Sequence, residues 1–200
     1  GWAYPGDLIK CPEYSTVYFY GFGQDRHYFP TESIFMTWQY DFSEVKIVTL
    51  VDLITLRLES NIKVRPGNIL VKVVTHPDVF AVGANSELYH IPSEKIAERL
   101  YGENWRDKVI DIPVVFWGDY KFAGELNGDF YPDGTLIKYP YDVKTYLLKD
   151  QKKRWFNTED SFYENHYYWK NIIQISNTFI YEDAEDIIYR EDNLIDPNYD

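Results

Sequence analysis

The chain has 200 residues, and its 20 Lys and Arg stand against 32 Asp and Glu, which gives a formal net charge of −12 at pH 7. This acidic balance disfavours nucleic acid and anionic membrane surfaces as partners, because like charges repel. Aromatic residues make up 18% of the chain, with 19 Tyr and 6 Trp, a surplus that suits either the thin cores of small modules or a surface that binds other molecules.

Cysteine and hydropathy say little about the compartment. The single cysteine, Cys11, permits no internal disulfide, so we expect a buried thiol, with an intermolecular bridge as the alternative. No apolar run approaches the roughly 18 residues that a membrane-spanning helix needs. No signal peptide is visible, so we expect either a cytoplasmic protein or a secreted one whose mature form starts at Gly1.

Four landmarks recur three times in the same order and at nearly the same spacing, so the sequence predicts three tandem modules. They are a first strand that ends in lysine (8–10, 70–72, 136–138), a second apolar run (17–20, 79–82, 145–148), a Pro- or Asn-containing helix start (29–32, 91–94, 156–159) and a final apolar run (45–48, 109–112, 172–175). We expect module one at 1–64, module two at 65–128, and module three with an acidic extension at 129–200. Modules of this size are marginal alone and should pack on one another.

Each module is predicted to be α+β and β-rich: a small antiparallel β-meander, a short helix and a fourth short strand. In module one the strands are expected at 7–10, 17–20, 26–29 and 45–48. The helices should begin after a hydroxyl cap followed by an acidic residue, namely Thr31-Glu32, Ser93-Glu94 and Thr158-Glu159. Residues 51–58 are expected to form one more helical turn.

The joints and the end of the chain have distinct compositions. Pro and Gly at 65–67 and 131–134 predict tight turns that hold the modules at fixed angles. Residues 182–200 are rich in Asp and Glu and depart from the repeat. We expect them to form a solvated end, a cap, or an arm for a neighbouring molecule.

The middle module carries a recognisable pattern: RPG, ILVK, VFAV, IPSEKIAERLYGENW and KVIDIP. This pattern resembles an uncharacterised tandem repeat of predicted secreted or cell-surface bacterial proteins, some from uncultivated small-genome lineages. The resemblance covers most of modules one and two, and module three more loosely. It implies architecture and an extracytoplasmic location, and no activity.

Catalytic motifs have no positive support in the sequence. The four histidines, His27, His76, His90 and His166, fall at different places in the modules, and no His-x-x-x-His pair exists. The recurring Glu32, Glu94 and Glu159 are explained by the helix starts. We therefore expect a protein that is not an enzyme and holds no cofactor.

Calcium is a further possibility. Asn127, Asp129 and Asp133 crowd the second joint, and oxygen-rich turns can hold this ion. The spacing lacks the ligand alternation of an EF-hand, so an Asp-Gly turn is the preferred interpretation.

Several basic and aromatic side chains are candidates for surface contacts. Lys10, Lys72 and Lys138 could contact a ligand or act as edge charges that block stray strand pairing. The set that we expect to face partners, by stacking on sugars or proteins, is Arg26, Tyr28, Arg154, Trp155, Tyr167, Tyr168 and Trp169.

The expected function is that of a non-enzymatic extracellular or cell-envelope protein for structure or adhesion, which associates with itself into a filament or surface assembly. Its expected partners are further copies or other surface proteins, without nucleic acid or membrane insertion. The alternative is a glycan- or cell-wall-binding module.

Overall fold

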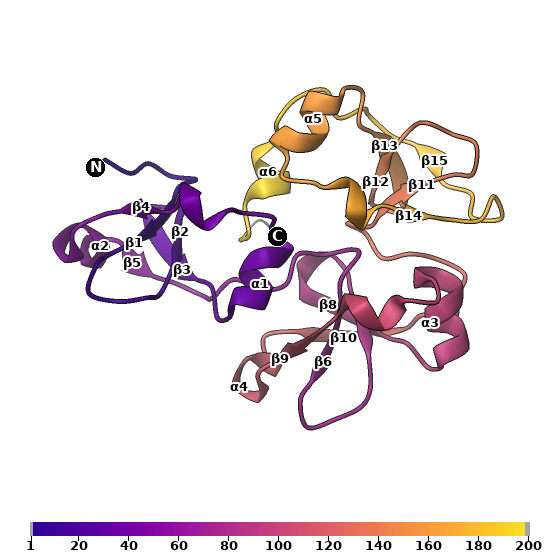
Figure 1. Ribbon diagram of the computed structural model, residues 1–200, viewed down its shortest axis with the longest axis horizontal. Coiled ribbons are helices and arrows are strands. Elements are labelled where there is room, and N and C mark those ends of the chain that lie inside the picture. Colours follow the sequence, from indigo (N-terminus) through magenta and orange to yellow (C-terminus); the bar gives the residue numbers. More distant parts are fainter. Residues whose placement is uncertain (1, 199–200) are drawn as a thin grey trace. The chain divides into compact units, whose positions relative to one another are not determined.

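The computed structural model describes residues 2–198 and contains three five-stranded sheets, one in each predicted module (Figure 1). In every sheet the first three strands form an antiparallel meander at the centre. The fourth strand pairs in parallel with the first, and the fifth pairs in parallel with the third. The predicted α+β class and the repeated meander with its helix and fourth strand are confirmed.

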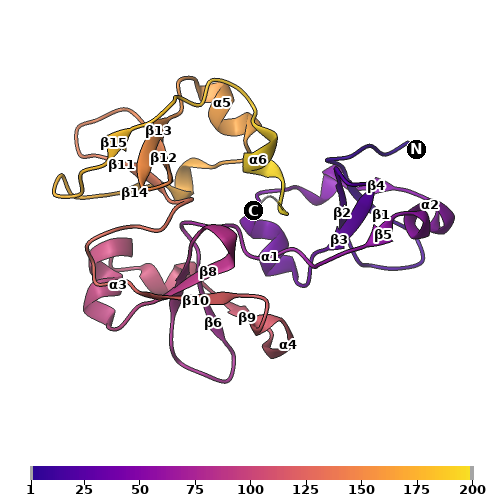
Figure 2. The same ribbon diagram turned by 180° about the vertical axis from the view of Figure 1, so that it is seen from behind.

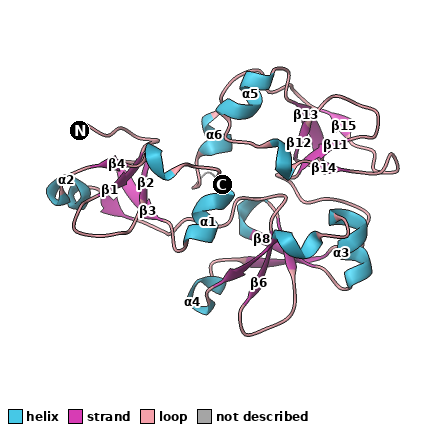
Figure 3. Ribbon diagram, viewed as in Figure 1, coloured by secondary structure: helices cyan, strands magenta, loops and turns pink. Residues whose placement is uncertain are grey.

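The five strands, the main helix and the 3-10 turn that follows it recur in the same order in the three modules, whereas the helix between strands four and five is found in modules one and two (Figure 3). Module one contains β1 (Leu8–Lys10), β2 (Tyr18–Gly21), β3 (Asp25–Tyr28), α1 (Glu32–Thr37), η1 (Phe42–Glu44), β4 (Lys46–Ile47), α2 (Leu50–Thr55) and β5 (Arg57–Leu58). Module two contains β6 (Leu70–Val73), β7 (Phe80–Val82), η2 (Ala84–Ser86), β8 (Glu87–His90), α3 (Glu94–Tyr101), η3 (Trp105–Lys108), β9 (Val109–Ile112), α4 (Val114–Trp117) and β10 (Lys121–Glu125). Module three contains β11 (Leu136–Lys138), β12 (Tyr146–Lys149), β13 (Lys152–Trp155), α5 (Glu159–Glu164), η4 (Trp169–Asn171), β14 (Ile173–Gln174) and β15 (Glu182–Asp183), and α6 (Asp192–Ile195) follows it.

The three main helices begin where the sequence predicts. The side chains of Thr31, Ser93 and Thr158 each accept a hydrogen bond from the backbone N–H three residues later, at 3.1, 3.3 and 3.0 Å. These bonds satisfy donors that the first helical turn leaves without intrahelical partners.

Equivalent backbone hydrogen bonds define which residues correspond between modules. A glycine with positive φ precedes the first strand of each module. Its N–H donates to a backbone carbonyl in the second strand. The three bonds are Gly6 to Tyr20 (2.8 Å), Gly67 to Val82 (2.9 Å) and Gly134 to Leu148 (2.7 Å). A second set closes each fifth-strand segment against strand three: Ile62 to Tyr28 (2.9 Å), Leu126 to His90 (2.9 Å) and Ile187 to Trp155 (2.8 Å).

Gly67 and Gly134 lie against each other within modules two and three, so neither position tolerates a side chain. A Cβ at position 67 would clash with the carbonyl oxygen of Gly134, and the φ of +118° at Gly67 also disfavours other residues. We expect Gly67→Ala to lower the free energy of unfolding by about 1–3 kcal/mol, measured by chemical denaturation. Gly118→Ala is the matched control, because Gly118 has φ −67° and no atom within 4 Å of an added Cβ. Equal losses in both variants would contradict this account.

Two interpretations of the sequence are corrected by the strand order: that of the acidic end and that of the recurring lysines. Residues 57–58 form β5 after the expected helical turn, and residues 182–183 of the acidic end form β15, so this end does not depart from the repeat at 182. The interpretation of the recurring lysines as edge charges is wrong. β1, β6 and β11 each lie between two strands, and Lys72 forms an ion pair with Asp111 at 2.7 Å.

The chain divides into two compact units. The first comprises residues up to Val64 together with the segment that begins at Asp192. The hydroxyl of Tyr40 donates to the carbonyl of Ile195 at 2.8 Å within this unit. A small core of Ile9, Cys11, Val48 and Leu53 lies under its sheet, so Cys11 is the buried thiol that was predicted.

The second unit, Arg65–Glu191, holds modules two and three, and one core joins them. From module two this core includes Leu70, Ala81, Leu100, Tyr101, Trp105 and Leu126, and from module three Ile137, Leu148, Ile175, Phe179 and Tyr181. Figure 2 shows the strands of the two modules and α3 from behind. Among residues 2–198 no helix combines the length and apolar character that a membrane crossing needs.

Candidate functional site

The residues predicted to face partners differ widely in exposure. Arg154 and Tyr167 are buried. Arg26, Tyr28 and Trp155 are half-buried, and Tyr168 and Trp169 are exposed. The prediction that Arg154 and Tyr167 lie at the surface is therefore wrong, since both side chains belong to the interior of module three.

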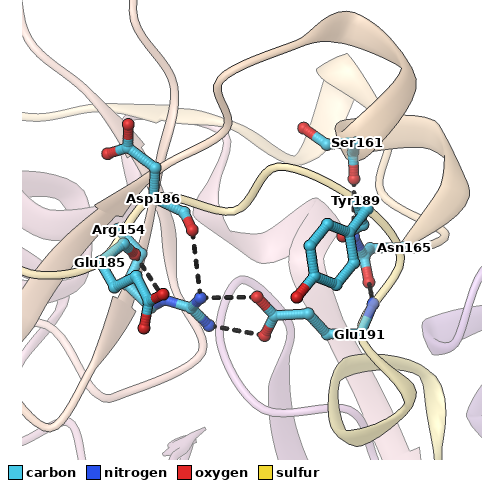
Figure 4. Close-up of polar contacts among 7 residues, drawn as sticks. All are labelled: Arg154, Ser161, Asn165, Glu185, Asp186, Tyr189 and Glu191. Carbon is cyan, nitrogen blue, oxygen red and sulfur yellow. Dashed lines mark hydrogen bonds and ion pairs between the residues drawn. The ribbon is translucent and has the colours of Figure 1, made fainter.

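Arg154 on β13 is the centre of a polar network (Figure 4). Its guanidinium forms a two-pronged ion pair with Glu191, with Nη1–Oε2 at 2.8 Å and Nη2–Oε1 at 2.6 Å. Its Nε donates to the carbonyl of Glu185 at 2.8 Å. The bond to Glu191 raises the pKa of Arg154. The side chains are only 10% and 20% exposed, so this guanidinium has little left to offer a ligand.

Asn165, just after α5, completes the network from the other side. Its amide donates to the carbonyls of Ser161 at 2.7 Å and Tyr189 at 3.1 Å, and its carbonyl accepts from the N–H of Glu191 at 2.9 Å. Figure 4 shows Asn165 between Ser161 of α5 and the segment that ends at Glu191. The network therefore fixes the segment after β15 against β13 and α5.

In module one, different side chains hold the segment that follows the fifth strand. His27 corresponds to Arg154 in the strand register, and its Nδ1 lies 2.7 Å from the carbonyl of Ser60. Trp38 donates from Nε1 to the carbonyl of Lys63 at 2.8 Å. Because this role recurs with unrelated residue types, it belongs to the architecture of the repeat.

The half-buried candidates are also engaged within the fold. Arg26 donates to the carbonyls of Leu53 and Leu56, each at 2.5 Å, at the end of α2. The ammonium of Lys144 lies 4.3 Å from the ring centroid of Trp155. That face of the indole is therefore covered by a cation and is not free to stack on a sugar.

The second joint is a turn held by one carboxylate. Asp133 accepts from the N–H groups of Asp150 at 2.8 Å and Gln151 at 2.9 Å, and from the Gln151 side chain at 2.8 Å. These bonds account for Asp133 without an ion. Across residues 2–198, no three His, Cys, Asp or Glu side chains are grouped so that they could hold a metal.

Aromatic side chains gather at the end of the main helix in modules one and three. Phe162 of α5 stacks on Trp169 with centroids 4.4 Å apart and rings 18° from parallel. Phe35 and Phe42 form the corresponding stack in module one, also at 4.4 Å. In module three, Trp169 remains 49% exposed and Tyr168 43% exposed, so the outer side of this cluster is available for contact.

Module one contains a hollow with a volume of about 410 Å³. It is lined by Trp2, Ala3, Ile9, Tyr20, Val48, Asp52, Thr55 and Leu56. Trp2 is 87% exposed. The lining thus combines an apolar floor with an indole, a phenol and a carboxylate, all of which can contact a partner. None of these residues was singled out in the sequence, although the small Ala3 aligns with Tyr131 before the glycine of module three.

Buried tyrosines make the second unit sensitive to alkali. Burial raises the pKa of Tyr89, Tyr146 and Tyr181 to about 12, and it raises the pKa of Tyr101 and Tyr131 further. An unfolded tyrosine ionises near pH 10. The resulting stability is therefore fully present below about pH 10 and is lost as the pH rises towards 12.

We expect the melting temperature to fall steeply above about pH 10, measured by circular dichroism. Absorbance of the phenolate should show these tyrosines ionising together with unfolding. A single titration of all 19 tyrosines near pH 10 in the folded protein would contradict the expectation.

Known proteins provide no match for this chain: no protein family fits the sequence, and neither a curated protein nor a solved structure is similar to it.

Proposed function

We propose that this chain is a non-enzymatic structural or adhesive repeat protein of the extracellular space or cell envelope, which associates with further copies of itself. The observation that supports the proposal is the contrast between polar side chains bonded inside the modules and aromatic side chains exposed on them. Polar side chains that could serve in binding or catalysis, such as Arg154 and His27, form hydrogen bonds inside the modules. Large aromatic residues, such as Trp2 and Trp169, are left at the surface.

Exposed aromatic residues favour a binding role because they give large contact areas at small cost in conformational entropy. Further large apolar side chains are exposed on module two, including Val115 of α4 and Phe122 of the edge strand β10. Edge strands offer unpaired backbone groups to other chains. The location rests on the resemblance of the middle module to repeats of predicted secreted and surface proteins.

Sedimentation velocity across a wide range of protein concentration tests the self-association. We expect the weight-average mass to rise with concentration above that of the 23.8 kDa chain. A single monomer boundary at every concentration would refute the proposed association. Immunogold imaging of the native cells tests the location, since label confined to the cytoplasm would refute an envelope protein.

Glycan or cell-wall binding is the second candidate, supported by the hollow in module one. An exposed indole near a carboxylate is suited to stack on a sugar ring and bind its hydroxyls. A glycan array and a peptidoglycan pull-down test this candidate, with Trp2→Ala as the matched variant. Signals that are absent, or unchanged in Trp2→Ala, would remove the hollow as a glycan site.

A further inference from the structure

The hollow in module one has a filled counterpart in module three. Ala3 and Tyr131 each lie three residues before the positive-φ glycine of their module, Gly6 and Gly134. Both glycines donate to the equivalent residue of the second strand. Ala3 and Tyr131 therefore occupy the same place in the repeat.

In module three this place is filled by the Tyr131 side chain, which is 1% exposed. Its hydroxyl donates to the carbonyl of Leu100 on α3 at 2.8 Å, and its ring lies 6.0 Å from that of Tyr101. Its ring is 4.9 Å from that of Phe179. The main helix of the preceding module thus covers the start of the following module.

The floors of the two places also correspond. By the register and the backbone bonds, Ile9, Tyr20 and Val48 of the hollow are equivalent to Ile137, Leu148 and Ile175. The latter three lie in the same core as Tyr131 and Leu100. In module one Ala3 stands at the place of Tyr131, and a hollow of about 410 Å³ remains there, walled by Trp2 and by Asp52, Thr55 and Leu56 of α2 and its C-cap. We call this hollow the seat.

The element that covers the corresponding place in module three has a counterpart with an exposed surface. α3 is followed by η3, whose first residue, Trp105, is 7% exposed in the shared core. α5 is followed by η4, whose first residue, Trp169, is 49% exposed. A side chain type that is buried at the internal junction is thus available at the end of module three.

We propose that the hollow of module one is a docking seat for a second copy of this chain, which inserts the α5–η4 end of its module three, led by Trp169. This inference rests on the self-association proposed above. The proposed contact resembles the junction of modules two and three, where the α3–η3 end packs against the start of module three. One chain carries both halves of such a contact, the hollow in module one and the exposed α5–η4 end of module three.

The charge beside the leading aromatic residue favours this end over its equivalent in module one. Trp169 is followed by the exposed Lys170, whereas Phe42 is followed by Ser43 and Glu44. The hollow carries the carboxylate of Asp52, which attracts Lys170 and repels Glu44. The contact joins two different surfaces, so repeated addition of copies gives an open filament unless the rotation between copies closes a ring.

Two variants that block opposite ends test the proposal. Ala3→Tyr fills the seat as Tyr131 does in module three, and Trp169→Lys removes the inserted side chain. Each variant alone should associate at least about tenfold more weakly than the wild type, as expected for loss of a central aromatic contact. Thr55→Tyr is a second seat-filling variant from α2, in case Ala3→Tyr is poorly folded. Tyr141→Lys is the control, because Tyr141 is fully exposed on module three and outside the α5–η4 end.

Mixing gives the sharpest result. Ala3→Tyr keeps a free α5–η4 end and Trp169→Lys keeps a free seat, so an equimolar mixture should form a one-to-one dimer that does not grow. A mixture that stays monomeric, or seat-filling variants that associate like the wild type, would overturn the docking seat while wild-type association still supports the proposed function. A wild-type protein that is monomeric throughout would overturn both. Loss of glycan binding in the seat-filling variants, with unchanged association, would assign the hollow to a sugar instead.

Discussion

Replacing Arg154 by methionine is expected to lower the free energy of unfolding of the second unit by about 3 kcal/mol, the lower end of the range for breaking a buried ion pair. Methionine keeps much of the apolar stem but removes the donors to Glu191 and to the carbonyl of Glu185. The Glu191 carboxylate then stays in a largely buried position without its cation. Chemical denaturation of the full chain, followed by tryptophan fluorescence, measures the loss.

Two comparisons separate this effect from ordinary surface charge. Lys152→Met removes the ion pair with Glu182, whose side chains are 50% and 82% exposed, and should cost less than about 1 kcal/mol. Arg154→Met combined with Glu191→Met should recover most of the loss, because no charge is then left without a partner. If the double variant is no more stable than Arg154→Met alone, the ion pair is not the source of the stability.

Replacing Tyr131 by alanine is expected to cost about 3–5 kcal/mol, as for other buried aromatic residues. The ring lies between Tyr101 of module two and Phe179 of module three. Its loss should leave a cavity in the core that joins the two modules. We therefore expect the unfolding of the second unit to split into two transitions in differential scanning calorimetry.

Tyr131→Phe isolates the hydroxyl from the ring. It removes only the bond to the carbonyl of Leu100, so we expect a loss of about 1 kcal/mol and a single transition. If Tyr131→Ala also unfolds in one step with a loss below about 1 kcal/mol, the two modules are held together by other contacts.

Local signals in the sequence were sufficient to predict the repeated architecture. Each main helix starts at a hydroxyl cap, and caps act over three residues, so Thr31, Ser93 and Thr158 could be identified without tertiary information. The meanders follow from short apolar runs separated by turn residues. The threefold recurrence strengthened each assignment, since one motif had to fit three places.

The fifth strand of modules one and three could not be predicted because it has almost no signal of its own, unlike the five-residue β10 of module two. β5 and β15 are two residues long, and Glu182 and Asp183 have the composition of a solvated end. They pair because the sheet offers strand three as an edge. Ion pairs with Lys152 at 3.4 Å and Lys153 at 2.8 Å then compensate the acidic charges.

The candidate contact residues were harder to assign because residue type alone does not determine burial. Arg is mostly exposed in proteins, so Arg154 was expected at the surface, and its partner Glu191 lies 37 residues further along the chain. The hollow, in contrast, was not predicted at all. Its signal is the small side chain of Ala3 where module three has Tyr131, and this comparison becomes informative only when the shared core around Tyr131 is known.

The inclusion of α6 in the first unit affects the order of events during synthesis on the ribosome. Domains near the amino terminus usually fold first as the nascent chain emerges. Here the unit that contains module one also includes Ile195, whose carbonyl accepts the hydrogen bond of Tyr40 and which is translated after module three. The unit that is translated first is therefore the last to be completed, and a ribosome stalled within module three would display it without this closing segment.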